Sequence, residues 1–116
     1  MSELATRIRA ILDEDPNVRE VRMFGGLCFM LNGNMLVCTT KDERLLARIG
    51  QAGLADALAV SGVVRMTMAG REMKDFVVVA QDAIADDGAL ARWIAVATRY
   101  VGPMPAKDKP ARRKTG

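Results

Sequence analysis

The chain has 116 residues, half of them apolar, and a formal net charge of +3 at pH 7. This length suits one domain with one core, and no stretch approaches the roughly 18 apolar residues that span a bilayer. Residues 103–116 hold five of the basic residues and one acid, so the part before them is close to neutral. The net charge therefore does not predict a nucleic-acid-binding surface on the folded part.

The N-terminal segment has the pattern of a short amphipathic helix. Leu4 and Ile8 recur at helical spacing. Ser2 is a favoured capping residue, and Pro16 ends the pattern. We expect this helix over about residues 2–13. The segment lacks the unbroken apolar run of a signal peptide, so the chain is predicted to be cytoplasmic, without membrane contact.

Asn32-Gly33 marks a hairpin turn between two apolar runs. This dipeptide favours a type I′ turn, in which both central residues take a positive φ. The preceding residues 18–32 are predicted to be extended, and so is the run that begins at Asn34. A two-residue loop pairs Leu31 with Asn34 and continues that register toward the two cysteines.

The register of this hairpin decides the state of Cys28 and Cys38. A regular ladder pairs Cys28 with Val37 and Cys38 with Leu27, which places the two sulfur atoms on opposite faces of the sheet and forbids a disulfide. A one-residue bulge would bring the cysteines opposite each other. We expect the regular ladder, with buried, inert thiols that stay reduced in a cytoplasm.

Both faces of the hairpin are apolar, whereas a half-exposed antiparallel sheet alternates apolar and polar residues. One face carries Leu27, Phe29, Leu31, Leu36 and Cys38. The other carries Cys28, Met30, Met35 and Val37, which we predict as an interface. We expect helices to cover one face, and a second subunit or a folded-back segment to cover the other. A homodimer is therefore expected.

The middle of the chain predicts a strand, a helix and a second hairpin. Residues 44–49 favour a third strand, with a helical turn as the alternative, and residues 51–59 favour a helix. A tight turn around Gly70 joins two further strands, residues 63–68 and 72–80. The pattern does not fix the register of this second hairpin.

A last helix begins at a cap formed by Asp86 or Asp87 and ends before Gly102. Residues 1–102 then form one domain, and residues 103–116 have the composition of a basic, disordered tail. The predicted order is helix, three strands, helix, two strands, helix. This order predicts an α+β, two-layer domain with a mostly antiparallel five-stranded sheet.

Gly25 and Gly26 lie between Phe24 and an apolar run, where a glycine pair can cradle a phosphate or bend a strand. A phosphate loop needs backbone N–H groups followed by a helix N-terminus, but these glycines run into a strand. We therefore expect a bulge, or a close approach to another backbone that a side chain would block.

The sequence shows no constellation for catalysis or metal binding. It has no histidine, the usual imidazole base, and its two cysteines do not complete a tetrahedral zinc site. Acidic pairs such as Asp42-Glu43 lie at predicted helix ends or turns, where capping and solvation explain them. We expect no catalytic residues, no cofactor and no metal. An enzyme of unrecognised type is the remote alternative.

The basic tail is the one nucleic-acid signal in the sequence. Its cations, which could contact phosphates, are Lys107, Lys109, Arg112, Arg113 and Lys114. The tail has no aromatic residue for base stacking. Weak, sequence-independent binding is therefore the alternative to a solvated tail.

Four stretches resemble the TfoX N-terminal domain family, also called Sxy. They are "RMFGGLCFMLNGNML", "GREMKDFVVV", "ALARWI" and "PMPAKDKP", and the resemblance runs over about residues 18–110. The residues that carry it are Met23, Phe24, Gly25, Gly26, Asn32, Gly33, Gly70, Arg71, Met73, Phe76 and Trp93.

The resemblance implies an α+β domain in which "MFGG" opens the first strand, with a fold similar to that of type III secretion chaperones, which are commonly dimers. Members of the family regulate genes for DNA uptake and natural competence, in association with the cyclic-AMP receptor protein at promoters. Full-length members carry a second, C-terminal domain, so we expect a stand-alone N-terminal domain here. The resemblance supplies no catalytic residues.

Residues and resemblance together predict a non-enzymatic regulatory or adaptor domain that acts by protein–protein contacts. The expected process is transcription or competence regulation, with the transcription machinery as a partner. The alternative is a nucleic-acid-associated protein that uses the basic tail.

Overall fold

The elements follow one another as the sequence predicts, with one strand more, in a computed structural model that describes residues 2–13, 15–23 and 25–107. In chain order they are α1 (Glu3–Leu12), β1 (Val18–Met23), β2 (Gly26–Leu31), β3 (Asn34–Thr39), β4 (Leu45–Arg48), α2 (Leu54–Leu58), β5 (Val63–Met68), β6 (Arg71–Val79), the 3₁₀ turn η1 (Gln81–Ile84) and α3 (Asp87–Val101).

The sheet has six strands instead of the five expected, because the segment predicted as one extended run folds back on itself. β1 and β2 form a hairpin in which Met23 lies opposite Gly26. Gly25 lies in the loop between them with a φ of +76°, a conformation that glycine adopts without strain. The "MFGG" motif therefore closes the first hairpin and does not open the first strand. Phe24 lies outside the described residues.

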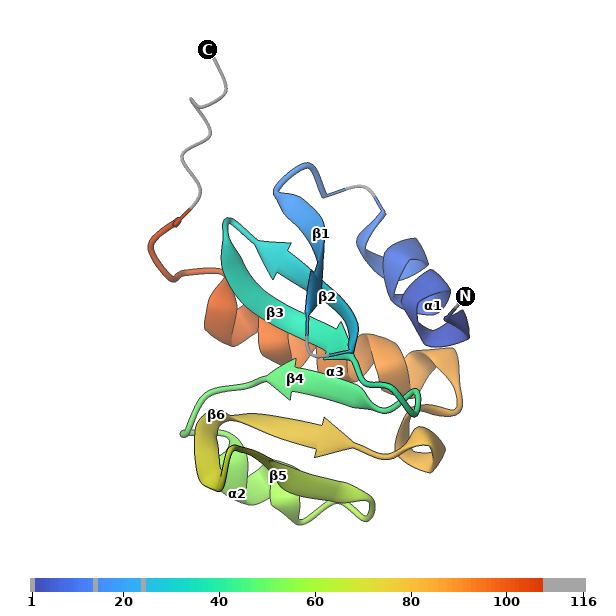
Figure 1. Cartoon of the computed structure of the whole chain (residues 1–116), viewed down its shortest axis with the longest axis vertical. Coiled ribbons are helices and arrows are strands. Elements are labelled where there is room, and N and C mark those ends of the chain that lie inside the picture. The colour runs from blue at the N-terminus through green and yellow to red at the C-terminus, as the bar shows by residue number, and fades with distance from the viewer. Residues whose placement is uncertain (1, 14, 24, 108–116) are drawn as a thin grey trace.

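All neighbouring strands are antiparallel, in the order β1-β2-β3-β4-β6-β5. α2 carries the chain from β4 to the outer edge, where β5 forms and β6 then returns between β5 and β4. The three α-helices pack on one face of this sheet, with α3 lying behind β3 and β4 (Figure 1). The predicted two-layer α+β architecture is confirmed.

The turn between β3 and β4 holds the N-terminus of α1. The Glu43 carboxylate accepts hydrogen bonds from the Leu4 N–H at 3.0 Å and from the Ser2 hydroxyl at 2.7 Å. Ser2 in turn accepts from the Ala5 N–H, as expected of its capping position. A carboxylate here also faces the positive end of the helix dipole. These contacts fix α1 against the end of the sheet.

α3 is capped as the sequence predicts and then packs along the sheet. The Asp86 carboxylate accepts from the Ala89 N–H at 2.9 Å. Arg7 ties α1 to this helix start, since it donates to the Ile84 carbonyl at 2.7 Å and pairs with Asp87 at 2.9 Å. The buried residues of α3 are Leu90, Ile94, Ala97 and Val101.

The β2–β3 hairpin contains a one-residue bulge. Next to the Asn32-Gly33 turn the register is the predicted one, with Met30 opposite Met35. Farther along, the register shifts by one residue and Cys28 lies opposite Cys38. The extra residue is Leu36, which has no partner on β2.

The bulge changes which side chains reach the core under the helices. Leu36 and Val37 are consecutive, yet both are fully buried in the same helix-side cluster. Cys38 then moves to the opposite face. The helix-side core is built from Leu4, Ile8, Phe29, Leu31, Leu36, Val37, Leu45, Ala47, Val77, Val79, Leu90, Ile94, Ala97 and Val101.

The chain after α3 returns to the β2–β3 turn. The side chain of Asn34 donates to the Pro105 carbonyl at 3.0 Å, and the Lys107 N–H donates to the Asn32 carbonyl at 2.8 Å. The first residues of the expected tail therefore lie against the domain. Among the described residues, no helix has both the length and the apolar character needed to cross a membrane.

Candidate functional site

The sheet face opposite the helices is apolar, and we call it the open face. One row of cross-strand partners crosses it from one sheet edge to the other. By the registers of the strand pairs, this row is Val21, Cys28, Cys38, Leu46, Val78 and Val64. None of the helices in the described ranges covers the row (Figure 1). Its end residues, Val21 and Val64, are 39% and 53% exposed.

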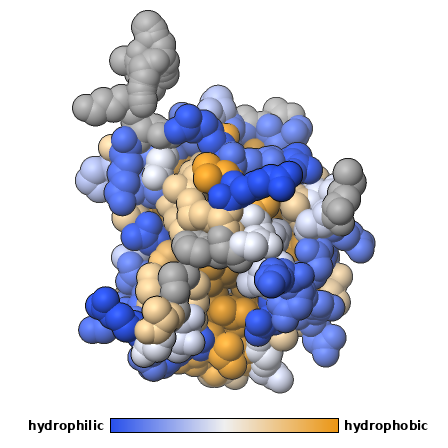
Figure 2. Space-filling view, viewed as in Figure 1, coloured by the Kyte–Doolittle hydropathy of each residue, from blue (hydrophilic) through white to orange (hydrophobic). Residues whose placement is uncertain are grey.

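Methionine side chains flank the row on the open face. They are Met23, Met30, Met35, Met66 and Met73, all partly buried. Beneath them, Cys28, Cys38, Leu46 and Phe76 are buried. Figure 2, drawn from this side, shows apolar side chains in a band down the middle with polar residues at the margins. Long, flexible thioether chains thus shield the middle of this face and remain able to rearrange.

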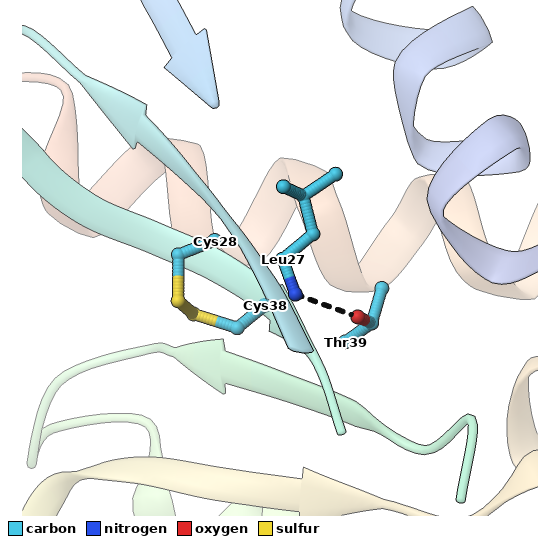
Figure 3. The surroundings of a disulfide bond; sticks show 4 residues. All are labelled: Leu27, Cys28, Cys38 and Thr39. Carbon is cyan, nitrogen blue, oxygen red and sulfur yellow. Dashed lines mark hydrogen bonds between the residues drawn. A yellow bond between two sulfur atoms is a disulfide. The ribbon is translucent and has the colours of Figure 1, made fainter. Parts of the chain in front are cut away.

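Cys28 and Cys38 form a disulfide at the centre of the open face. The expectation of reduced, unpaired thiols is wrong, because the bulge at Leu36 brings the two Cα atoms to 4.0 Å. In Figure 3 the disulfide bridges β2 and β3, while the Leu27 side chain points away from it. The Leu27 N–H donates to the Thr39 hydroxyl at 3.0 Å beside the bridge.

The same bulge corrects the predicted interface. Cys28, Met30 and Met35 do lie on the open face, as grouped from the sequence. Val37 does not, because the extra residue turns it into the core beneath the helices, where it is fully buried.

Arg48 lies on the open face at the end of β4, opposite Phe76 of β6. Its guanidinium carbon is 5.5 Å from the centre of the Phe76 ring, which is cation–π distance. Its Nη2 atom is 3.8 Å from a carboxylate oxygen of Asp75, too far for a hydrogen bond. Its Nε atom is buried and has no hydrogen-bond partner among the described residues. The side chain is 17% exposed.

Asp75 also contacts the helix layer. The Tyr100 hydroxyl of α3 donates to the Asp75 carboxylate at 3.1 Å. Burial, and secondly this hydrogen bond, raise the pKa of Tyr100 above its ordinary value. The backbone carbonyl of Asp75 accepts from the N–H groups of Ile49 and Gly50, which follow β4. Asp75 therefore joins β6 to the end of β4 and to α3.

A cleft of about 880 Å³ lies beside the β1–β2 turn, between α1 and the β3–β4 turn. Its charged lining residues are Arg9, Arg22, Lys41 and Glu43. Glu43 is engaged by the α1 N-terminus, and Arg9 pairs with Glu20 at 2.7 Å, an interaction that lowers the pKa of Glu20. The Ser2 hydroxyl also has a structural role in this lining, since it accepts from the Ala5 N–H and donates to Glu43.

At Gly26, β2 passes close to the backbone of β3. A Cβ atom at this position would collide with the carbonyl oxygen of Thr39, which the sheet holds in place. At Gly25 a Cβ would lie 2.8 Å from the Cγ atom of the flexible Lys41 side chain. The glycine pair thus combines a turn with a close backbone approach, and β2, not a helix, follows it.

The other residues that carry the family resemblance are spread over the domain. Asn32 and Gly33, with φ values of 55° and 82°, form the β2–β3 turn, and Gly70, with a φ of 80°, lies in the β5–β6 turn. Met73 and Phe76 lie on the open face, whereas Trp93 packs against the helix-side core. Arg71 begins β6 and is exposed.

Of the tail cations, Lys107 is exposed and described. Lys109, Arg112, Arg113 and Lys114 lie outside the described residues. Within the part of the chain that the structure describes, no three His, Cys, Asp or Glu side chains are grouped as metal ligands.

Sequence reasoning missed Arg48 and its contact with Phe76. The alternation of β4 places Arg48 on the same face as Leu46, so part of the signal was present. The pairing of β4 with β6 could not be predicted, because the residue pattern fixes neither the register of the second hairpin nor the crossover through α2.

Comparison with known proteins identifies one family. The model of the TfoX N-terminal domain matches residues 10–100. A search of curated proteins found no significant match, and neither did a search of solved structures.

Proposed function

The chain belongs to the TfoX N-terminal domain family, and on this premise we propose that it is a non-enzymatic regulatory module that acts through protein–protein contacts of its open face. The observation that carries this proposal is the apolar row across all six strands, which methionines flank and no described helix covers. A contiguous apolar patch with polar margins is typical of an interaction site. Methionine suits surfaces that adapt to a partner.

The regulated process that we propose is transcription, in line with what the family resemblance implies. Purified full-length chain would be tested for binding to the cyclic-AMP receptor protein and to RNA polymerase. Binding to either, lost when the open face is altered, supports the proposal. Equal binding by wild-type and altered chains places the contact elsewhere on the molecule.

A matched pair of valines tests the open face itself. Val64 at the β5 edge is 53% exposed, and Val96 on the outer side of α3 is 36% exposed. We expect Val64→Glu to abolish capture of partner proteins, because it places a carboxylate in the apolar row, and Val96→Glu to leave capture intact. Circular dichroism would show that both variants fold. Loss of capture in both, or in neither, contradicts the proposal.

The homodimer expected from the sequence stays a prediction; on the open face, a second copy would compete with a partner protein. Multi-angle light scattering of wild type and Val64→Glu tests it, since a dimer through this face dissociates in the variant.

A further inference from the structure

We infer that the partner of the open face is an acidic amphipathic helix, and that one of its carboxylates binds Arg48. This inference rests on the proposed function, since it names the chemistry of the partner at the same surface. Three observations carry it: the unsatisfied donors of Arg48, the sign of the charges on the open face, and the length of the apolar row.

Arg48 has hydrogen-bond donors that the described chain leaves unused. Nε has no acceptor, and the nearest carboxylate oxygen to Nη2, on Asp75, is 3.8 Å away. The guanidinium is held over the Phe76 ring among apolar side chains, where an unmet donor is costly. A carboxylate is the acceptor that the planar guanidinium binds best, because it can take two parallel N–H···O bonds.

The charges that the strands place on the open face are basic. Arg48 lies opposite Phe76, and Arg71 lies two residues before Met73 in β6, so both take open-face positions, and Arg71 is exposed. Two of the strand acids lie on the other side: the cross-strand partner of Glu20 is Phe29 of the helix-side core, and Glu72 precedes the open-face residue Met73. The third, Asp75, accepts a hydrogen bond from Tyr100 of α3 and forms only a long ion pair with Arg48, with 3.8 Å between Nη2 and a carboxylate oxygen.

Charge complementarity therefore favours an acidic occupant over a second copy of this chain. Two copies packed through the open face would bring the Arg48 and Arg71 side chains of both chains into one interface, while Asp75, the strand acid beside Arg48, already accepts from Tyr100. A partner with carboxylates beside an apolar stripe meets both the row and the arginines. Arginine is one of the residue types enriched among binding hot spots, which lie in well-packed, desolvated pockets.

The row also fits a helix in length. Six strands at about 4.8 Å spacing span about 24 Å, the length of about 16 helical residues. α3, with 15 residues, covers the same sheet from the other side. An amphipathic helix would complete a second helical layer over the methionines.

A pair of synthetic peptides tests the inference. Both are 16-residue helices with a leucine stripe; in one the flanking residues are glutamates, in the other glutamines. Each is titrated into the full-length chain by fluorescence anisotropy. We expect the glutamate peptide to bind about 10-fold more tightly, since a hydrogen bond to a charged group is worth at least that much. Raising the salt concentration should narrow the difference.

Arg48 variants locate the effect. Arg48→Met keeps the length of the side-chain stem, and we expect the affinities of the two peptides for this variant to lie within about 2-fold of each other. Arg48→Lys should retain part of the preference for the glutamate peptide. Arg99→Met, an exposed arginine in the last turn of α3, is the matched control and should change nothing. Val64→Glu should weaken the binding of both peptides.

Several results would overturn the inference. In the peptide titrations, these are equal binding of the two peptides, no binding of either, or an unchanged preference of Arg48→Met for the glutamate peptide. In light scattering, it is a wild-type dimer that the Val64→Glu substitution dissociates, which would make a second copy the occupant of the open face. Each leaves the proposed function standing if Val64→Glu still loses its protein partners. If Val64→Glu keeps them, the proposed function itself fails.

Discussion

Leu45 and Leu46 are neighbours in β4, but they are buried by different means. Leu45 is 0% exposed and lies under the helix layer, among residues of α1, α3 and the sheet. Leu46 is 3% exposed and lies on the open face among the disulfide, Phe76 and flexible methionines. Equal burial thus reflects a rigid, interlocked core on one side and an adaptable apolar layer on the other.

This contrast separates the stability of the domain from its interaction surface. The helix side is closed by residues from every part of the chain, so it determines the fold. The open face contributes burial too, but its cover is five methionines that can change rotamer without moving the backbone. A partner can therefore displace that cover at little cost to the fold.

The largest expected effect is the loss of stability in Leu45→Ala, which is compared with the loss in Leu46→Ala. Leu45→Ala should lower the free energy of unfolding by about 3–4 kcal/mol, because the interlocked core cannot close the cavity. Leu46→Ala should cost about 2 kcal/mol, since methionines can move into the space. Urea denaturation of both variants measures the difference. Equal losses would mean that the open face is as rigid as the helix side.

Gly26 probes the backbone between the faces. Gly26→Ala should cost roughly 3 kcal/mol, because its Cβ collides with the Thr39 carbonyl and β2 must move away from β3. Gly53→Ala is the control: its Cβ would meet its nearest neighbour, the Ile49 carbonyl oxygen, at an ordinary 3.8 Å. Thermal unfolding of both variants gives the comparison. A stable Gly26→Ala chain would contradict the close approach.

Reduction of the disulfide tests how much this covalent link on the open face contributes to the stability of the domain. Closure of a loop by cysteines ten residues apart is worth about 2–3 kcal/mol in the chain-entropy account. We expect a dithiol reductant to lower the urea midpoint of the wild type accordingly. The Cys28→Ala/Cys38→Ala double variant should be unaffected by the reductant. A wild type that is equally unaffected would refute the bridge.

The smallest effect concerns the contact between the layers at Asp75. Tyr100→Phe removes the donor to the Asp75 carboxylate and should cost about 1 kcal/mol at pH 7. The folded-state pKa of Tyr100 is raised, so the contribution of its protonated form is complete below the unfolded value of about 10 and is lost as the pH rises through the folded value.

A pH series makes this prediction specific to the hydroxyl. The stability difference between wild type and Tyr100→Phe should be constant near neutral pH and should shrink in alkali. A difference that does not change with pH would assign the cost to packing alone.

Local patterns predicted most of the fold. The caps at Ser2 and Asp86 and the Asn32-Gly33 turn depend on neighbouring residues, and the structure contains all three. The first hairpin was missed because a glycine pair ahead of an apolar run also fits a phosphate loop or a bend within one strand, whereas the chain reverses at Gly25.

The candidate site was predicted in part. The apolar pattern on both sides of the β2–β3 hairpin correctly groups Cys28, Met30 and Met35 on one face. The disulfide and the burial of Val37 depend on the bulge, which a hairpin with apolar residues on both faces neither requires nor excludes. Arg48 depends on pairing between strands far apart in the chain, which local spacing does not encode.

Because of the bulge, this hairpin tolerates the loss of a residue from β3 better than a change of length in β2. β3 holds one residue more than the partner segment of β2, so a chain that lacks Leu36 would keep every other side chain on its present face and lose only the leucine's share of the core. Loss or gain of a residue within β2 would instead invert everything beyond it, with charges turned inward and core residues turned out. Shortening at Leu36 is thus milder than a length change within β2.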